Sequence, residues 1–169
     1  MEPEAAREVY AGPLLRLDVE TWGGREYDVV HHPGAAAVLP LLPDGDALLV
    51  RQMRHAIRDQ LVEIPAGILD VEGEDALTAA ARELFEETGH RHRSIEFLGG
   101  VFTSAGFADE YIHLFLADAE AEPDGRPEDG IEIVRRPLGE LAAAARAGRV
   151  RDAKTALAIL LADARRAPK

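Results

Sequence analysis

Three glutamates, Glu83, Glu86 and Glu87, stand at spacings that bring their carboxylates together on one side of a helix. Residues three or four positions apart face the same side of an α-helix, where like charges repel by roughly a few tenths of a kcal/mol per pair. Near the carboxyl end of a helix each anion costs a further ~0.3–1 kcal/mol. A divalent cation with a preference for oxygen ligands would compensate for both effects. The alternative interpretation is an ordinary solvated helix face.

The helix that must position these carboxylates is predicted between about residues 75 and 89. Its apolar residues recur at intervals of three and four and form one stripe, opposite the glutamates. The stripe consists of Leu77, Ala80, Ala81, Leu84, Phe85 and Thr88. Asp75 is a suitable N-cap, and Gly89 suits the left-handed conformation that ends many helices. The pattern therefore predicts an amphipathic helix with one acidic side.

The residues around this helix form a longer motif. It begins at Gly67, reaches Glu74 after six intervening residues, passes seven more and then reads Arg82-Glu83-Leu84-Phe85-Glu86-Glu87-Thr88-Gly89. This segment resembles the signature of the Nudix hydrolases, which is Gly, five residues, Glu, seven residues and Arg-Glu-apolar-x-Glu-Glu-x-Gly-apolar. The chain differs by one extra residue before Glu74 and by His90 at the final apolar position. Neither difference moves the carboxylates out of register.

The resemblance implies a site that holds a pyrophosphate through Mg²⁺, with Mn²⁺ as a possible substitute. By position, Glu83 and Glu87 are implied to be the main metal ligands, with help from Glu86 and from the backbone carbonyl of Ala66. In the family the arginine, here Arg82, orients the helix carboxylates, and the earlier glutamate braces the loop before the helix. Divalent ions suit the reaction because phosphoanhydride cleavage needs neutralised phosphate charge and a partly deprotonated water.

The composition excludes several other classes of function. With 31 acidic and 19 basic residues among 169, the chain has a formal charge of −12, which repels nucleic acids and anionic membranes. The chain has no cysteine, so thiolate zinc sites and thiol nucleophiles are excluded. Its six histidines, including the adjacent His31 and His32, do not stand at ligand spacing, and we expect ordinary core or surface residues. No apolar run approaches the roughly 20 residues that cross a bilayer. We expect a cytoplasmic globular protein with no nucleic-acid or membrane partner.

The elements around the central helix predict a mixed sheet between helical layers. Two alternating segments joined by Gly23-Gly24 predict a β-hairpin from Leu14 to His32. Further strands are predicted at 35–42, 47–54, 61–64, 95–103, 111–117 and 131–135, and helices at 138–147 and 152–165. Pro40 cannot donate a ladder hydrogen bond, so it predicts an edge or a bulge. This order predicts an α/β fold. With the resemblance, it implies a Nudix-type α/β/α sandwich: a hairpin segment, residues 1–34, extends a hydrolase domain, residues 35–169.

A wider resemblance, over roughly residues 10 to 160, is to the bacterial ADP-ribose pyrophosphatases. It rests on four blocks: His32-Pro33-Gly34, the strand from Leu48 to Arg54, the stretch from Val62 to Gly67 and the segment from Thr103 to Glu110. In that subgroup the N-terminal strands exchange across a homodimer and complete the partner's substrate pocket.

The same resemblance implies residues for substrate binding. Arg25 and Tyr27 would reach adenosine in the neighbouring site of the homodimer. Arg54 and Arg51 would contact phosphate or the terminal ribose, since a guanidinium suits both. Gly106 lies in the implied substrate loop. The structural alternatives are solvent-exposed arginines and a half-buried packing role for Tyr27.

The residue that activates water has several candidates. Glu110 starts a predicted strand after the Gly106 loop, and Glu128 and Asp129 lie on an acidic loop where relatives place a mobile carboxylate. The sequence ranks Glu110 and Glu128 equally, with Asp129 behind them.

The function implied by the resemblance is divalent-metal-dependent hydrolysis of ADP-ribose to AMP and ribose 5-phosphate. One alternative is a Nudix pyrophosphatase for another nucleoside diphosphate derivative, such as a nucleotide sugar, a dinucleoside polyphosphate or a dinucleotide cofactor. Others are a module that binds ADP-ribose without cutting it, and an acidic scaffold for partner proteins. Ala105 stands where ADP-ribose-preferring relatives usually have proline, so the sequence does not decide the exact substrate.

Overall fold

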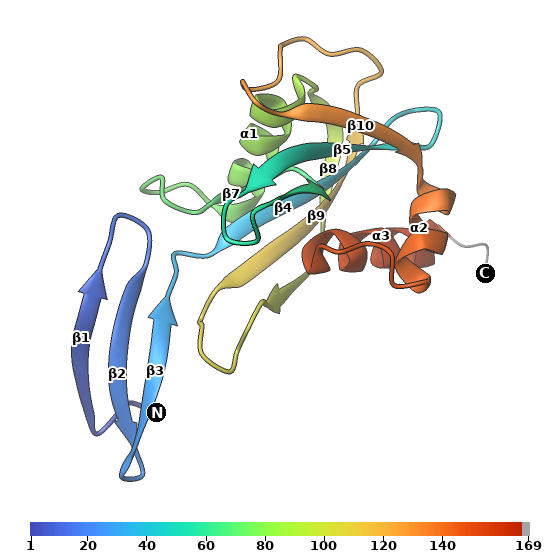
Figure 1. Ribbon diagram of the computed structural model, residues 1–169. Coiled ribbons are helices and arrows are strands. Elements are labelled where there is room, and N and C mark those ends of the chain that lie inside the picture. The colour runs from blue at the N-terminus through green and yellow to red at the C-terminus, as the bar shows by residue number, and fades with distance from the viewer. Residues whose placement is uncertain (167–169) are drawn as a thin grey trace.

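The computed structural model describes residues 1–166 and shows two β-sheets of unequal size (Figure 1). The N-terminal sheet is antiparallel and contains β1 (Ala5–Ala11), β2 (Arg16–Trp22) and β3 (Arg25–His31). The predicted hairpin is present as β2 and β3, with Gly23 and Gly24 at φ values of 58° and 74°, the positive values that this tight turn requires. The prediction missed β1, because every residue of this strand is exposed and no apolar alternation marks it. The predicted hairpin is therefore corrected to a three-stranded sheet.

The main sheet has the strand order β10-β5-β4-β9-β8, with β6 paired to β5 and β7 paired to β4. Its strands are β4 (Ala35–Leu41), β5 (Asp46–Arg54), β6 (Asp59–Glu63), β7 (Ala66–Ile68), β8 (His92–Phe102), β9 (Tyr111–Ala119) and β10 (Glu132–Pro137). Strands β4 and β9 run parallel, whereas the other pairs are antiparallel. The predicted mixed sheet is confirmed.

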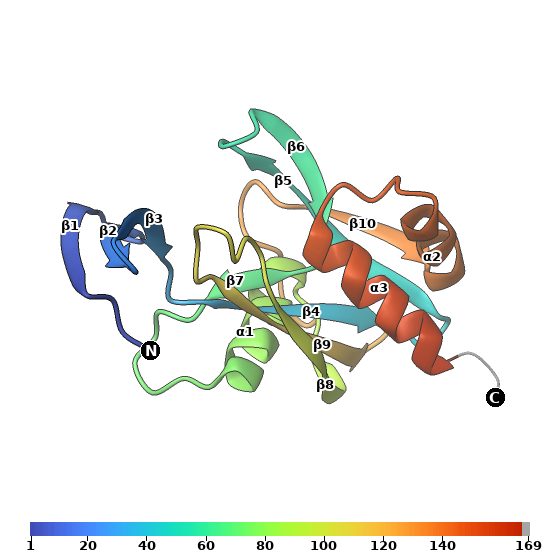
Figure 2. The same ribbon diagram turned by 90° about the horizontal axis from the view of Figure 1, so that it is seen from below.

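Helices cover both faces of this sheet (Figure 2). One face carries α1 (Ala76–Thr88), and the other carries α2 (Leu138–Arg146) and α3 (Ala153–Arg166). Along β4, Ala36 and Val38 belong to the cluster under α1, whereas Ala37 and Leu39 belong to the cluster under α3. A strand covered on both faces is apolar throughout, which explains why every residue of β4 is buried. The α/β/α sandwich is confirmed, and no helix among residues 1–166 is long and apolar enough to cross a membrane.

The position of Pro40 differs from the prediction. The proline lies in the central strand β4, at neither an edge nor a bulge. The N–H of Val38 donates to the Pro65 carbonyl and therefore points away from β9. The backbone nitrogen of Pro40, two residues later, points in the same direction. Strands β4 and β5 pair there only between Leu41 and Ala47. The missing donor thus coincides with an opening between two strands, and the chain from β6 to β7 enters that opening.

Helix α1 begins and ends as the sequence predicts. Asp75 accepts a hydrogen bond from the Thr78 N–H at 2.7 Å, and Gly89 adopts the left-handed conformation with φ 73°. His90, at the position where the signature has an apolar residue, is buried, and its Nδ1 lies 3.0 Å from the Thr88 carbonyl oxygen. His90 therefore occupies the buried position of the apolar residue, and its Nδ1 still has a polar partner in the Thr88 carbonyl.

Candidate active site

One arginine gathers three carboxylates where α1 meets the loop before it. Arg82 donates two hydrogen bonds of 3.0 Å to Glu74, one of 2.6 Å to Glu83 and one of 2.8 Å to Glu86. The bonds with Glu74 raise the pKa of Arg82, and the same bonds hold the pKa of the Glu74 carboxyl below its ordinary value. The guanidinium thus links the loop to the helix and fixes two of the helix carboxylates.

The carboxylates of Glu83 and Glu87 are buried, at 9% and 6% residue exposure. Burial raises the pKa of Glu87 to about 7; a hydrogen bond from the Ala66 N–H opposes this, and the charges of Glu83 and Glu128 add to it. Burial also raises the pKa of Glu83, against the nearby charge of Arg82. A solvated helix face is therefore excluded for these two residues. They form instead a pair of desolvated anions with too little positive charge beside them.

Strand β7 brings its backbone against both carboxylates. The Ala66 N–H donates to Glu87 Oε2 at 3.1 Å. A Cβ added to Gly67 would lie 1.9 Å from Glu83 Oε1, so only glycine leaves that carboxylate in place. Carboxylate oxygens gathered around a glycine cradle suit a hard divalent cation such as Mg²⁺. The predicted role of the Ala66 carbonyl as a ligand stays a prediction.

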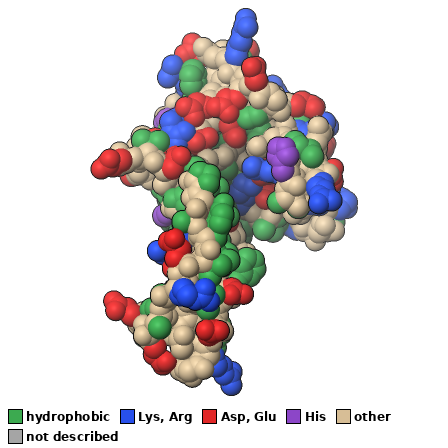
Figure 3. All heavy atoms as spheres, turned by 60° about the vertical axis from the view of Figure 1, so that its left-hand side comes forward, with side chains coloured by type: hydrophobic (Ala, Val, Ile, Leu, Met, Phe, Trp, Pro, Cys, Tyr) green, Lys and Arg blue, Asp and Glu red, His purple; other side chains and the backbone are tan. Residues whose placement is uncertain are grey.

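The acidic loop after β9 lies against the end of α1. The N–H of Glu128 donates to the Glu86 carbonyl at 3.0 Å, and the N–H groups of Asp124 and Gly125 donate to the Gly89 carbonyl at 2.8 and 3.0 Å. The charge of Glu128 acts on both Glu83 and Glu87. This loop thus lies against the carboxyl end of α1 through its backbone, and Figure 3 shows acidic side chains gathered on one face of the molecule.

A cavity of about 680 Å³ lies beside these carboxylates. Its lining includes Ala66 and Gly67 on one side and Arg54, Glu63, Lys154 and Glu110 on others. Glu110 accepts a hydrogen bond of 2.6 Å from the Thr103 hydroxyl, and one of its oxygens lies 3.7 Å from His32 Nδ1. The two leading candidates for the base therefore lie apart: Glu110 lines the cavity, whereas Glu128 contacts the Glu86 carbonyl of α1 through its backbone N–H.

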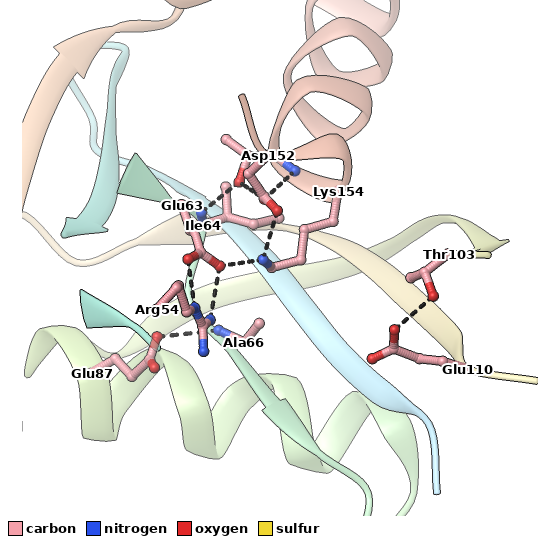
Figure 4. Close-up of polar contacts among 10 residues, drawn as sticks. Arg54, Glu63, Ile64, Ala66, Glu87, Thr103, Glu110, Asp152 and Lys154 are labelled. Atoms are coloured by element: carbon pink, nitrogen blue, oxygen red, sulfur yellow. Dashed lines mark hydrogen bonds and ion pairs between the residues drawn. The ribbon is translucent and has the colours of Figure 1, made fainter. Parts of the chain in front are cut away.

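The wall of this cavity contains an ion network that the sequence analysis missed (Figure 4). Glu63 is 1% exposed and accepts hydrogen bonds from Arg54 Nε at 2.6 Å and Nη2 at 2.8 Å. Lys154, at the start of α3, pairs with Glu63 and lies 3.1 Å from Asp152. Burial raises the pKa of Glu63, but the hydrogen bond from Arg54 and the charge of Lys154 outweigh it and hold the pKa below its ordinary value.

A signal for half of this network was present in the sequence. Glu63 stands between the apolar residues Val62 and Ile64, where a charge must be buried or paired. Lys154 carries no such signal, because a lysine in the first turn of an alanine-rich helix reads as an exposed residue.

The chain matches the model of the NUDIX domain over residues 30–157. It belongs to the Nudix family. This Nudix chain is 35% identical over 164 residues to the ADP-ribose pyrophosphatase of Bacillus subtilis, a match that covers 92% of the chain and 88% of that relative. It is 33% identical over 135 residues to the GDP-mannose pyrophosphatase of Cronobacter sakazakii, a match that covers 73% of the chain and 70% of that relative.

The fold is also similar to that of a solved relative. The crystal structure of an ADP compounds hydrolase superposes with a TM-score of 0.78 at 19% identity, over 97% of this chain and 94% of that one. The Nudix chain is therefore a pyrophosphohydrolase with the fold and the signature carboxylates of its family, whose members typically depend on a divalent metal.

Arg51 and Arg54, the two arginines that the resemblance implies for substrate binding, line two different hollows of the Nudix chain. Arg54 lines the cavity beside the carboxylates, whereas Arg51 lines a separate hollow between β5, β6 and the α2–α3 pair. Arg51 donates to the exposed carboxylate of Glu132 at 3.0 and 3.1 Å. Residues three apart on a strand point to opposite faces of the sheet, so the sequence pattern itself could have separated these two arginines.

The other implied substrate residues gather around the N-terminal sheet of the Nudix chain. Tyr27 and Gly106 line one hollow of about 370 Å³ between β3 and the loop after β8. Tyr27 is half exposed, and Arg25 lies exposed beside the turn that joins β2 to β3. None of the three lines the cavity beside the carboxylates of their own chain.

Proposed function

We propose that this Nudix hydrolase is a Mg²⁺-dependent pyrophosphatase that cleaves ADP-ribose to AMP and ribose 5-phosphate. The observation that carries the proposal is the pair of buried carboxylates, Glu83 and Glu87, whose pKa values are raised, beside a cavity that Arg54 lines. The similarity to the Bacillus subtilis ADP-ribose pyrophosphatase over 92% of the chain supports the choice of substrate.

Residues of α1 would hold Mg²⁺, with Mn²⁺ as a substitute. Glu83 and Glu87 are the main ligands in this proposal, and Glu86 assists them. The bound ion would neutralise pyrophosphate oxygens and favour ionisation of a water molecule. Arg82 and Glu74 keep the carboxylates in position, since one guanidinium joins all three of its acidic partners.

Arg54 is suited to bind a phosphate of the substrate. Its Nε and Nη2 donate to Glu63, whereas its Nη1 has no hydrogen-bond partner among residues 1–166. The Arg54 side chain is 40% exposed and lines the cavity, so this proposal assigns the remaining nitrogen to a phosphate oxygen of the substrate. The bidentate contact with Glu63 fixes the plane of the guanidinium before substrate arrives, which reduces the entropy lost on binding.

We assign the base to Glu128 in preference to Glu110. The Glu128 N–H donates to the Glu86 carbonyl at 3.0 Å, which holds this residue of the acidic loop beside the helix that carries the main ligands. One Glu110 oxygen is already engaged by the Thr103 hydroxyl. Under this assignment Glu128→Gln lowers kcat by about 10²-fold or more, and Glu110→Gln lowers it less. The reverse order in kcat, measured at saturating Mg²⁺, would transfer the role to Glu110.

A homodimer forms part of the proposal. The N-terminal sheet exposes Val9, Tyr10 and Tyr27, and a three-stranded sheet with so little core is marginal by itself. In a homodimer these strands would complete the partner's pocket through Arg25 and Tyr27. Light scattering should then give twice the mass of one chain. The cytoplasmic location expected from the cysteine-free sequence belongs to the same proposal.

Mixing two inactive variants tests the shared pocket. A chain with Glu87→Gln lacks a metal ligand, and a chain with Arg25→Ala and Tyr27→Ala lacks the residues it lends to its partner. If the pocket is shared, exchange of subunits restores activity in a fraction of the mixed dimers. A mixture that stays inactive, although light scattering shows dimers and subunit exchange is demonstrated by tagging, contradicts the shared pocket.

A substrate panel distinguishes the candidate activities. We expect the highest kcat/KM for ADP-ribose, with AMP as a product, over GDP-mannose, a diadenosine polyphosphate and a dinucleotide cofactor. GDP-mannose is included because a GDP-mannose pyrophosphatase is among the relatives. Tight binding of ADP-ribose by calorimetry with no product would indicate the non-catalytic module instead. Hydrolysis in oxygen-18 water would identify the phosphorus that is attacked.

A further inference from the structure

A second group of ionisable side chains lies in the N-terminal sheet and shares no residue with the cluster on α1. It consists of Asp18 and Glu20 on β2 and His31 on β3, and one ligand atom from each lies within 4.8 Å of the others. Arg16 stands opposite His31 in the antiparallel ladder, so residues 16, 18 and 20 share the face of the sheet that carries His31. His31 Nε2 lies 3.4 Å from Asp18 Oδ2 and 3.8 Å from Glu20 Oε1.

The polar atoms of this cluster are buried without sufficient partners. The Asp18 side chain is only 7% exposed, and its Oδ1 accepts no hydrogen bond from any residue that the structure describes. The same holds for His31 Nε2 within residues 1–166. The Arg16 guanidinium, half exposed, lies 3.4 Å from the other Asp18 oxygen. A buried carboxylate oxygen without a donor costs about 1–3 kcal/mol, so a ligand that contacts this oxygen would stabilise the arrangement.

The neighbours of His31 direct Nε2 toward the two carboxylates. Its Nδ1 lies 2.6 Å from Asp109 Oδ2, and Asp109 is itself held by the His32 N–H at 2.8 Å. When Nδ1 donates its proton to Asp109, Nε2 presents a lone pair to Asp18 and Glu20. Trp22 donates to Glu20 Oε2 at 2.7 Å, which leaves Oε1 on the side of His31. A carboxylate behind a histidine is the usual arrangement at metal-bound imidazoles.

We propose that Asp18, Glu20 and His31 bind a divalent transition-metal ion of the Zn²⁺ type, with Asp109 as the residue that positions His31. One imidazole nitrogen and two carboxylate oxygens form a ligand set that Zn²⁺ accepts and Mg²⁺ does not favour. The ion would join β2 and β3 to the segment before β9 that carries Asp109. It would therefore brace the N-terminal sheet against the main domain. The expectation that His31 is an ordinary residue is replaced by this proposal.

Calorimetric titration of the full chain with ZnCl₂ tests the site. Excess Mg²⁺ in the buffer occupies oxygen-only sites but competes poorly for an imidazole. We expect one tightly bound Zn²⁺ per chain, and at least 100-fold weaker binding in Asp18→Asn and in His31→Gln. Asp109→Asn should weaken binding about 10–100-fold, because the histidine loses its orientation. His92→Gln removes an exposed histidine of β8 and serves as the matched control, with unchanged binding.

Two further measurements make the outcome decisive. Circular dichroism checks that each variant is folded, and Asp18→Asn preserves the size of the side chain if His31→Gln is unstable. Zn²⁺ should raise the Tm of the wild-type chain and of His92→Gln, but not that of Asp18→Asn. Equal Zn²⁺ affinity in the wild type and in both ligand variants would overturn the proposal. The absence of Zn²⁺ binding to the wild type would overturn it as well.

Discussion

Two buried glutamates near the same cavity differ in how their charge is compensated. Glu63, on the wall formed by β6, is 1% exposed and contacts both Arg54 and Lys154. Glu87, on α1, is 6% exposed and has a backbone N–H as its hydrogen-bond donor; the charge of Arg54 also acts on it, but burial and the charges of two carboxylates outweigh both. The pKa of Glu63 is held below its ordinary value, whereas the pKa of Glu87 is raised to about 7.

This difference shows that burial alone does not distinguish a structural carboxylate from one suited to a cation. The charge of Glu63 is matched by permanent cations of the chain, so it can shape the pocket and hold Arg54. The charge of Glu87 is not fully compensated by cations of the chain, and a divalent cation would supply the missing positive charge. Substitutions at the two positions should therefore have opposite effects on the stability of the metal-free chain.

The largest effect is expected for Glu63→Gln. Removal of this charge leaves Arg54 and Lys154 without their common partner, and breaking a buried ion pair typically costs about 3–5 kcal/mol. Because Arg54 is 40% exposed and stays hydrated, we expect about 3 kcal/mol of lost stability in urea unfolding. Glu132→Gln is the matched control, since it breaks the exposed pair with Arg51 and should cost about 0–1 kcal/mol. Equal losses in the two variants would remove the distinction.

Glu87→Gln should affect catalysis strongly while the chain stays folded. We expect kcat to fall about 10²-fold or more at saturating Mg²⁺, which corresponds to about 2.7 kcal/mol of lost transition-state stabilisation. Steady-state assays of AMP release would measure it. Glu72→Gln, an exposed residue of the loop before α1, is the control and should keep its activity. Unchanged turnover of the Glu87 variant would contradict its assignment as a ligand.

The stability of the metal-free chain should depend on pH through Glu87. Its pKa of about 7 in the folded chain exceeds the ordinary value of 4.5, so the folded state binds more protons than the unfolded state between these values. Stability from this group is therefore present below about pH 4.5 and is lost as pH rises to about 7. Because one pKa unit corresponds to about 1.4 kcal/mol, we expect a loss on the order of 3 kcal/mol by urea unfolding in EDTA. Glu87→Gln should lack this fall and be the more stable chain at pH 8.

The smallest effects on catalysis are expected for the arginines. Arg54→Ala should raise KM for ADP-ribose about 10-fold, since a charge-assisted contact to phosphate is lost, which is about 1.4 kcal/mol. Arg51→Ala should leave kcat/KM within about twofold, because Arg51 lines a different hollow on the other face of β5. A larger effect for Arg51 than for Arg54 in the same assay would show that the cavity beside α1 is not where the substrate binds.

The features that could be read from the sequence are those that local geometry determines. Helical spacing places Glu83, Glu86 and Glu87 on neighbouring turns, and Asp75 and Gly89 set the ends of α1 through their own side-chain and backbone preferences. Most strands of the main sheet were predicted because apolar patterns follow directly from burial on one or both faces. Strand β1 was missed, since an exposed edge strand carries no such pattern.

The sequence by itself determined the signature, its helix and the acidic, cysteine-free composition, because each depends on neighbours along the chain. Only the tertiary structure decided which charges meet. Glu63 and Lys154 are 91 residues apart, and His31 and Asp109 are 78 apart, so no local spacing records either contact. The tertiary structure also desolvated Glu83 and Glu87 against β7, where Gly67 leaves room for a carboxylate. Burial and charge compensation are sums over the whole fold, and they turn a common run of glutamates into a site suited to a cation.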